Sequence, residues 1–440
     1  MPLWGQMGSS CRLSAEKKGA RGGPHSLALL LLVLTGTGCA STKDTLEGTV
    51  YIYLGLTEHQ TLNAEIVKTK RERVGRFLTA FQSEHPGVHV QLQFYSEEDL
   101  PAQLRRRNGA GQGPDLLLIN AETARHLSRN QLVRSIQPSD EVKDQILPET
   151  LTPLADGSDS YVGLPFVFEP QLACFNKALI QHPPSTLDEL LALSDTTDGI
   201  GLPLNMSSLY WTLGSLGAEQ SYARLIRGEK LTAEMKKTLL RWLRWLQDSN
   251  THVGMYFYMS IDLLRQDFLA GKLAWVSCRS PFIANFAGHL TKEFETALLP
   301  NGRLGRASPL DDQRVWAFGV NSSENQRRIA DAITAFSVNP LVQFRLTLGS
   351  DELLPVNRKV VIPVNSSPFL QTLKDSQAEG PTMSPELLNY LGDDELQTLT
   401  NELMVKLLYG NLTPEKTLAQ LVSLLAKRTE GGRRRAPTHL

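Results

Sequence analysis

The amino-acid sequence predicts an α/β fold arranged in two lobes. Two patterns support the fold class: β-rich runs alternate with runs of helical periodicity, and one short apolar run looks like a strand covered on both faces. Chain length supports two lobes, because about 400 residues remain once an N-terminal leader is removed, more than one hydrophobic core usually organises. The composition, 41% hydrophobic and 21% charged, is ordinary for a folded protein.

The N-terminal segment has the order of a secretory signal. Its apolar run covers only residues 27–34, whereas a membrane-spanning helix needs about 20 apolar residues. Basic residues precede this run and small residues follow it, as in a signal that is cleaved after export. We therefore expect residues 1–38 to be a signal peptide and the mature protein to be exported.

The leader ends in LTGTGCAS, which resembles a bacterial lipobox. Cys39 follows Gly38 and would be acylated as the new N-terminus, with residues 39–47 as a tether. Each buried acyl CH₂ would contribute about 0.8 kcal/mol to membrane attachment. Gly36 stands where the lipobox prefers Leu, so ordinary cleavage without a lipid stays an alternative.

The segment after the leader predicts a β-α-β-α-β order. Val74, Phe77, Leu78 and Phe81 form the i, i+3, i+4, i+7 stripe of a helix that buries one face. Apolar residues alternate from 88 to 94, which predicts a half-buried strand. The expected elements are strand 48–56, the helix through 74–81, strand 88–94, a helix near 97–108 and strand 116–119. This order favours a mostly parallel sheet.

Later segments again alternate between predicted strands and helices, but the sequence contains no internal repeat. Ser185 is a candidate N-cap for a Leu-rich helix, and the helix through 232–248 would bury Met235, Leu239, Trp242, Leu243 and Leu246. Gly271 would end a helix before a strand, and the helix at 325–336 would turn Ile329, Ile333 and Phe336 inward.

The net charge and the cysteines bear on the partner and on the redox state that we expect for this protein. The formal net charge is −1, so no positive excess indicates a nucleic-acid partner. Residues 427–440 are basic and contain Gly and Pro, which predicts a disordered, solvated tail. Cys174 and Cys278 remain in the folded part, and although an exported compartment permits a disulfide, we favour two buried free thiols.

No catalytic motif stands out. The sequence contains no G-x-S-x-G elbow, no H-E-x-x-H and no Walker A loop. The Gly-rich stretch at 109–115 precedes a strand and does not open a helix, so we interpret it as a turn. His85 and His89 have no further Cys or His nearby, which argues against a metal site. We expect no cofactor, and nothing selects a glycosidase-like pair among the many carboxylates.

Six segments in the same order and spacing match one family. They include GQGPDLLLIN from residue 111, GLPFVFEP from 163, DFLAGKLAW from 267 and LLPVNRKV from 353. The chain resembles extracellular solute-binding proteins of ABC importers, in the branch that includes maltose-binding protein, over nearly all of its mature length.

The resemblance implies a two-lobed periplasmic-binding-protein fold of type II, in which each lobe is a mostly parallel sheet flanked by helices. Hinge crossings would fall near Glu169, Pro300 and Gly349. Lobe I would then comprise 48–169 and 301–348, and lobe II would comprise 170–300 and 349–426. A solute would bind in the cleft and the lobes would close around it.

By the same resemblance, several residues are candidates for contact with the solute. Tyr210 matches a stacking aromatic directly, and Trp211 beside it is either a second contact or a neighbour in the core. Glu169 matches a hinge carboxylate that bonds sugar hydroxyls, with a hinge salt bridge as the alternative. Trp316 begins a strand at the cleft, or is simply buried in the core.

Two further candidates follow the buried strand 116–119. Asn120 and Glu122 lie where the carboxyl end of a parallel strand would meet the cleft, although an N-cap and a first-turn acid would also explain them. The chain departs from the family where Arg279 and Phe282 replace a Gly-aromatic turn, and where an aromatic near Ile119 is missing. Arg279 could bind a solute or hold an internal acid. These changes suggest a small or partly anionic solute, such as a disaccharide, a glycosylglycerol-like osmolyte or a sugar phosphate.

The expected function is therefore solute binding without catalysis. The resemblance implies a monomer that captures a sugar or sugar-like solute and delivers it to an ABC permease in the membrane. Two alternatives stay open: a sensor subunit that reports the solute to a receptor, and a secreted glycoside hydrolase on a similar scaffold.

Overall fold

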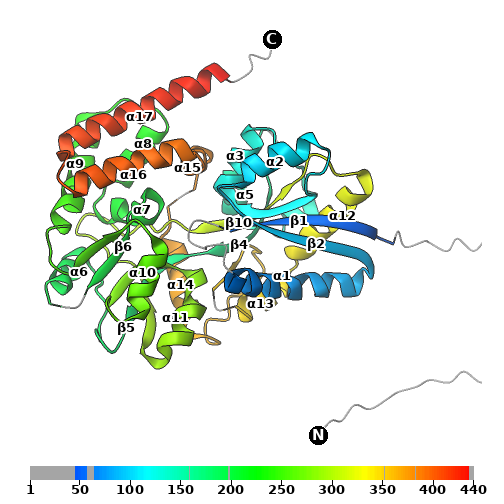
Figure 1. Ribbon diagram of the computed structural model, residues 1–440, viewed down its shortest axis with the longest axis horizontal. Coiled ribbons are helices and arrows are strands. Elements are labelled where there is room, and N and C mark those ends of the chain that lie inside the picture. Colours follow the sequence, from blue (N-terminus) through cyan, green and yellow to red (C-terminus); the bar gives the residue numbers. More distant parts are fainter. Residues whose placement is uncertain are drawn as a thin grey trace, which may run out of the picture. The chain divides into compact units, whose positions relative to one another are not determined.

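The computed structural model describes residues 45–435, apart from 57–63, 158, 197–198, 351 and 382 (Figure 1). The expected signal peptide, the acylation candidate Cys39 and most of the expected tether lie outside the described residues. The chain from Thr45 onward forms one compact unit. No helix in the described part is both long enough and apolar enough to cross a membrane.

The first of two sheets has six strands. Their order is β11-β4-β10-β3-β1-β2. β1, β2, β3 and β4 run in one direction, and β10 and β11 run in the other. The strands are β1 Glu47–Leu56, β2 Gly87–Ser96, β3 Leu116–Asn120, β4 Leu164–Glu169, β10 Asp312–Phe318 and β11 Leu354–Pro355. We call this sheet and the helices packed on it the first lobe.

Alternate side chains of the first sheet face opposite layers of helices, as the period of two along a strand requires. Ile52 and Leu54 of β1 pack in the same cluster as α1 and α12. Tyr53 packs on the other face with α2 and α3 (Figure 1). The helices are α1 Ala64–Glu84, α2 Leu100–Gly109, α3 Ala121–Arg129, α4 Asp140–Lys143, α5 Pro148–Leu151, η1 Thr152–Leu154, α12 Glu324–Ser337 and α13 Pro340–Leu348.

The second sheet has five strands in the order β7-β6-β8-β5-β9. β5 runs antiparallel to both of its neighbours, and the other strands share one direction. The strands are β5 Gln171–Asn176, β6 Ile200–Pro203, β7 Met255–Tyr258, β8 Trp275–Arg279 and β9 Phe294–Ala297. The second lobe is this sheet with its helices, so the predicted α/β architecture of mostly parallel sheets is confirmed.

Two layers of helices cover the second sheet. One layer is α6 Leu187–Ser194, α7 Met206–Ser215, α8 Glu219–Ile226, α9 Ala233–Ser249, α15 Pro385–Leu391, α16 Asp394–Leu408 and α17 Pro414–Arg435. The other is α10 Ile261–Leu269, η2 Ser280–Phe282, α11 Ile283–Leu290, η3 Thr291–Glu293 and α14 Pro368–Glu379. Trp242 and Leu243 of α9 are fully buried, as its sequence pattern predicts.

The chain passes between the two sheets three times. β4 ends at Glu169 and β5 begins at Gln171, so the first crossing is at Pro170. The second crossing lies between β9 and β10. The third differs from the expectation near Gly349, because Leu354 and Pro355 still pair with β4 and the chain moves to the second sheet only afterwards. A two-residue strand carries too little pattern to be recognised in the sequence.

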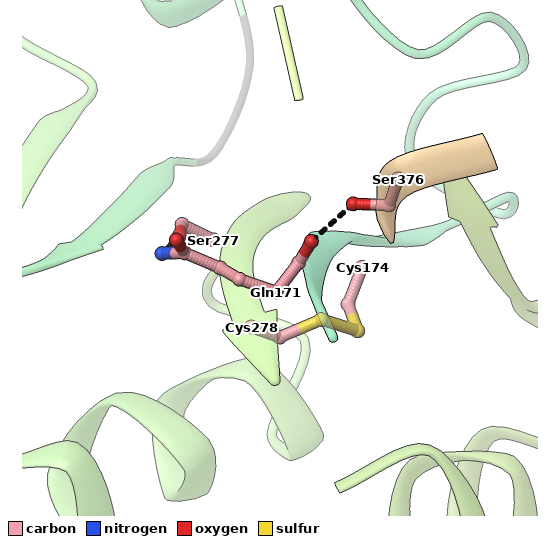
Figure 2. Close-up of a disulfide and its surroundings, with 5 residues drawn as sticks. All are labelled: Gln171, Cys174, Ser277, Cys278 and Ser376. Atoms are coloured by element: carbon pink, nitrogen blue, oxygen red, sulfur yellow. Dashed lines mark hydrogen bonds between the residues drawn. A yellow bond between two sulfur atoms is a disulfide. The ribbon is translucent and has the colours of Figure 1, made fainter. Parts of the chain in front are cut away.

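The expectation of two free thiols is wrong. Cys174 of β5 and Cys278 of β8 form a disulfide, with their Cα atoms 5.9 Å apart (Figure 2). The two strands pair antiparallel, with Cys174 opposite Val276 and Leu172 opposite Cys278. Sequence spacing alone does not reveal which strands are neighbours, and it is this pairing that brings the thiols together.

Two chain boundaries also differ from the sequence analysis. The N-cap of α6 is Thr186, whose hydroxyl accepts from the Glu189 N–H, and the expected cap Ser185 instead donates to the Glu189 carboxylate. Helix α17 extends to Arg435, into the segment expected to be disordered.

Candidate functional site

A cavity of about 150 Å³ lies between the two lobes. Asn120 at the end of β3, Arg279 at the end of β8 and Asp312 at the start of β10 all line it. The crevice beyond the carboxyl ends of parallel strands is the usual binding position in open α/β sheets. Polar side chains dominate the lining, and its described residues include no Phe, Tyr or Trp.

A buried arginine organises the wall formed by the first lobe. One Nη atom of Arg314 donates to Glu97 Oε1 at 2.7 Å and to Asn120 Oδ1 at 2.6 Å. The other Nη donates to the carbonyl oxygens of Gly55 and Leu118. These bonds fix Asn120 in place, and its Nδ2 in turn donates to Glu122 Oε1 at 3.0 Å.

Three carboxyl groups at the cavity have raised pKa values. Burial raises the pKa of Glu122 to about 8, and the nearby charges of Asp312 and Glu97 add to the effect. Burial also raises the pKa of Asp311 to about 7 and that of Asp312 to about 6, in both cases against the opposing charge of Arg279. Carboxyl groups with such values cluster at functional sites.

The second lobe supplies Arg279, the residue after the disulfide-bonded Cys278. Its Nη1 donates to the Leu310 carbonyl oxygen at 2.7 Å and pairs with Asp312 at 2.7 Å. Gln171 connects several segments beneath Arg279. Its side-chain nitrogen donates to the Ser208 carbonyl and to the Ser277 hydroxyl. Its backbone carbonyl accepts from the Ser376 hydroxyl (Figure 2). The disulfide and these hydrogen bonds thus hold the end of β8 in place.

The first turns of α7 and α16 complete the second wall. Asn205 caps α7 by accepting from the Ser208 N–H at 2.8 Å, and Ser207 lies beside it. On α16, Asp394, Gln397 and Asn401 are spaced three and four residues apart and all line the cavity, as neighbours on one helical face do.

The lobes touch directly beside the cavity, where α3 meets α15. Arg125 Nε donates to Asn389 Oδ1 at 3.1 Å. A Cβ atom on Gly392 would lie 2.3 Å from the Glu122 carbonyl oxygen, so only glycine allows this approach of the two backbones.

Three of the expected site residues line the cavity: Asn120, Glu122 and Arg279. Tyr210 and Trp211 do not. Both are buried in the core of the second lobe, where Tyr210 is 1% exposed and packs edge-on against Tyr222. The sequence match selected a helix that reaches the cavity, but the wrong face of it. Asn205 and Ser207, at the start of α7, line the cavity, and Tyr210 and Trp211 face the core.

The other three expected residues also lie away from this cavity. Glu169 pairs with Lys70 at 3.4 Å. A salt bridge was the alternative to solute contact that the sequence left open for this residue. Although burial opposes this, Lys70 and Arg314 lower the pKa of Glu169. Trp316 is fully buried and donates from its indole to Ser337. Phe282 packs under the Arg265 guanidinium, 4.8 Å from the ring centre.

The sequence analysis missed several residues that line or organise the cavity. Glu97 follows β2, so the strand-end argument that selected Asn120 could have found it. Asp312 lies at the amino end of β10, which runs antiparallel to its neighbours, so the same argument could not have found it. No pattern in the neighbouring sequence indicates Arg314 or the face of α16 that lines the cavity. The position of Arg314 depends on which strands pair with β10, and that of α16 depends on the return of the chain to the second lobe. Among the described residues, no cluster of His, Cys, Asp and Glu could hold a metal ion.

Comparison with known proteins shows the family and the fold. A family model for "Bacterial extracellular solute-binding protein" matches residues 77–372. A maltotriose-binding protein of Pyrococcus abyssi is 31% identical over 105 residues, which spans 23% of this chain and 22% of that protein. The match therefore covers about a fifth of the relative's length.

Solved structures resemble the whole fold. The GacH receptor of Streptomyces glaucescens, solved unliganded and with acarbose, has 17% identity and a TM-score of 0.69 over 89% of this chain and 100% of its own. MalE of Bdellovibrio bacteriovorus, bound to maltotriose, has 18% identity and a TM-score of 0.66 over 88% and 100%. A solute-binding protein of Thermotoga lettingae with α-D-tagatose has 17% identity and a TM-score of 0.65 over 87% and 100%. At such identities the likeness shows the fold alone.

Proposed function

Because the chain belongs to the bacterial extracellular solute-binding protein family, we propose that it is the binding component of an ABC importer. It captures a sugar or sugar-like solute between its lobes and delivers it to a membrane permease. The observation that carries this proposal is the polar cavity between the strand ends of the two sheets, lined from both lobes. Such a position lets closure around the solute distinguish the loaded protein from the empty one.

The chemistry of the lining suits hydroxyl groups. Asn120, Asn205, Gln397 and Asn401 offer amide groups that can donate and accept, and the carboxyl groups accept. A solute with many hydroxyls can satisfy such a lining, whereas an apolar solute would leave its polar groups unpaired.

The size of the cavity favours a small solute. Pockets for drug-sized ligands have about 300–1,000 Å³, and this cavity alone has about 150 Å³. A second hollow of about 580 Å³ shares Asn205 and Asn401 with it. The structural neighbours include one bound to maltotriose and one bound to the monosaccharide α-D-tagatose. Of these two sizes, the monosaccharide fits the volume better.

Solute entry requires the lobes to separate where α3 meets α15. The Arg125–Asn389 hydrogen bond and the contact of Gly392 with Glu122 close one side of the cavity. The three crossings between the sheets supply a hinge, and hinge closure around a ligand is a common domain motion. We infer that the structure represents the closed form.

A blocking variant tests the location of the site. Thermal unfolding of the purified chain with a panel of monosaccharides, disaccharides and short oligosaccharides identifies the solute, which should add about 2.7 kcal/mol at a hundred times its Kd. Ser207→Trp would fill the cavity and abolish this stabilisation, and the matched control Ser207→Ala would retain it. Solute binding that survives Ser207→Trp would place the site elsewhere.

The N-terminal anchor belongs to the same proposal. A lipid on Cys39 would hold the binding protein near its permease and raise the effective concentration of loaded protein there. Mass spectrometry of the mature N-terminus from a bacterial host should find a diacylated or triacylated Cys39. An unmodified Cys39, or cleavage elsewhere, would contradict the anchor without affecting the binding site.

A further inference from the structure

Acidic side chains outnumber basic ones around the cavity. Six carboxyl groups line it, namely Glu97, Glu98, Glu122, Asp311, Asp312 and Asp394, against one guanidinium, that of Arg279, and one imidazole, that of His126. Two of the six are neutralised by direct contacts: Asp312 by Arg279 at 2.7 Å, and Glu97 by Arg314 at 2.7 Å from behind the wall. Both arginines are therefore already occupied.

The charge of Arg279 also acts on Asp311, but the remaining four carboxyl groups form no direct ion pair within the described part of the chain. No described lysine or arginine forms an ion pair with Glu98, Glu122, Asp311 or Asp394. Of these, Glu122 accepts hydrogen bonds from Asn120 and from its own backbone N–H, and Asp311 accepts one from the Gln171 N–H. A lining of this kind disfavours an anionic solute, the opposite of what Arg279 alone suggests in the sequence.

Two buried nitrogen atoms of lining residues, Arg279 Nε and His126 Nδ1, also lack a hydrogen-bond partner among the described residues. Arg279 is 4% exposed, and its Nε has no hydrogen-bond acceptor in the described structure. Leaving such a group unpaired costs free energy, so an acceptor oxygen of a bound molecule would complete it. Neither the carboxylates nor this donor is explained by interactions inside the protein.

On the basis of the proposed function, we propose that the solute is a small polyhydroxylated molecule that carries a protonated amine, of which a hexosamine is the simplest case. The ammonium group lies among Glu122, Asp311 and Asp394, and a hydroxyl or ring oxygen accepts from Arg279 Nε. Charge-assisted hydrogen bonds to carboxylates are stronger than neutral ones.

This assignment also accounts for the absence of aromatic rings from the lining. Neutral sugars are commonly held by aromatic faces against their C–H surface, and the described lining has none. An ammonium group supplies binding free energy through charge, so a stacking ring becomes dispensable. A bound ammonium would also lower the raised pKa values of Glu122 and Asp311 by favouring their charged forms.

Matched sugars test the proposal on the full chain. Isothermal titration calorimetry compares glucosamine, galactosamine and mannosamine with glucose, galactose and mannose, and with glucuronate and galacturonate. The titrations are run at about pH 6.5, where such amines are protonated, and at about pH 7.5, where more of the Glu122 and Asp311 carboxyl groups are charged before binding. At least one amino sugar should bind about tenfold or more tightly than its parent hexose. Its affinity should fall as the salt concentration rises.

Variants assign the preference to the carboxylates. Glu122→Gln keeps the shape of the side chain and should reduce the preference for the amino sugar about tenfold, with a smaller effect on the parent sugar. Asp394→Asn, at an exposed position that threatens folding less, should act in the same direction. Glu234→Gln, on the exposed face of α9 away from the cavity, is the control and should leave the preference unchanged.

The outcomes separate this inference from the proposed function. Equal or tighter binding of a parent hexose or a uronate would overturn the amine and leave the sugar-binding function intact. A preference that survives both Glu122→Gln and Asp394→Asn would overturn the assignment of the carboxylates. Absence of binding by every member of the panel at millimolar concentration would overturn both.

Discussion

At the scale of single residues, Arg314 is the residue on which the site depends most. Its guanidinium reaches Glu97, Asn120 and two backbone carbonyls from within the first sheet, and it is almost fully buried. It therefore sets the positions of the polar groups that face the cavity without itself lining it. Because Arg uses a planar fork of donors, lysine cannot reproduce this set of bonds.

Replacing Arg314 should destabilise the fold. Arg314→Met leaves the Glu97 carboxylate buried without its partner, which typically costs about 3–5 kcal/mol. Urea denaturation monitored by tryptophan fluorescence measures the change. The control Arg303→Met breaks an exposed pair with Asp188, and such pairs contribute about 0–1 kcal/mol. Similar losses in the two variants would contradict the role given to Arg314.

The pKa of Glu122 predicts a dependence of stability on pH. In the folded protein this pKa is raised from 4.5 to about 8, so the folded state binds more protons than the unfolded state between these values. Stability therefore falls as the pH rises from about 4.5 to 8. Glu122→Gln should remove part of this loss, on the order of 1–2 kcal/mol at pH 8 for a half-buried group.

Urea titrations of the wild type and of Glu122→Gln at several pH values provide the measurement. The two stability curves should converge towards pH 4 and separate towards pH 8, with the variant the more stable. Parallel curves across this range would show that Glu122 titrates as it does in solvent.

At the scale of elements, the disulfide joins the two strands that hold Arg279 in place. β5 follows the first crossing and β8 ends at the cavity. The bond closes a sequence separation of 104 residues. A cross-link over such a loop restricts the unfolded chain strongly.

Loss of the disulfide should lower stability more than affinity. The double variant Cys174→Ser/Cys278→Ser should lose about 2–4 kcal/mol of unfolding free energy. Its solute affinity should change little, because the backbone pairing of β5 with β8 remains. Reductant should destabilise the wild type and leave the double variant unaffected. A wild type that is insensitive to reductant after complete reduction would contradict this expectation.

Elements with strong periodicity could be predicted from the sequence, and their neighbours in space could not. The stripe from Val74 to Phe81 and the alternation from 88 to 94 became α1 and β2. By contrast, the pairing of β5 with β8, and with it the disulfide, depends on segments about a hundred residues apart. The two-residue strand β11, which moved the third crossing, has no pattern of its own.

The site was predictable to the same extent. Asn120 and Glu122 were found because the geometry of parallel sheets brings the carboxyl end of a strand to the cavity, and Arg279 was found because the chain departs there from the family pattern. Tyr210 and Trp211 lie on the correct helix but on its core face. The face of α16 reaches the cavity only because the chain returns to the second lobe after β11, which no local signal announces.

At the scale of the whole molecule, the arrangement of the lobes places residues from both of them around the cavity proposed as the site. Both sheets direct strand ends towards it, and both lobes contribute carboxylates and amides. The Arg125–Asn389 hydrogen bond joins the two lobes beside the cavity. Under the proposed function this contact would open for solute exchange, so binding and the change in shape would depend on neighbouring residues.

The measurement that tests this account most directly is a crystal structure of the protein with its solute bound, whether the solute copurifies or comes from the sugar panel. We predict the solute in the cavity between the lobes, with hydrogen bonds to Asn120, Glu122 and Arg279 and to at least one of Gln397 and Asn401. A solute bound outside this cavity, or held by one lobe alone without these residues, would contradict the account.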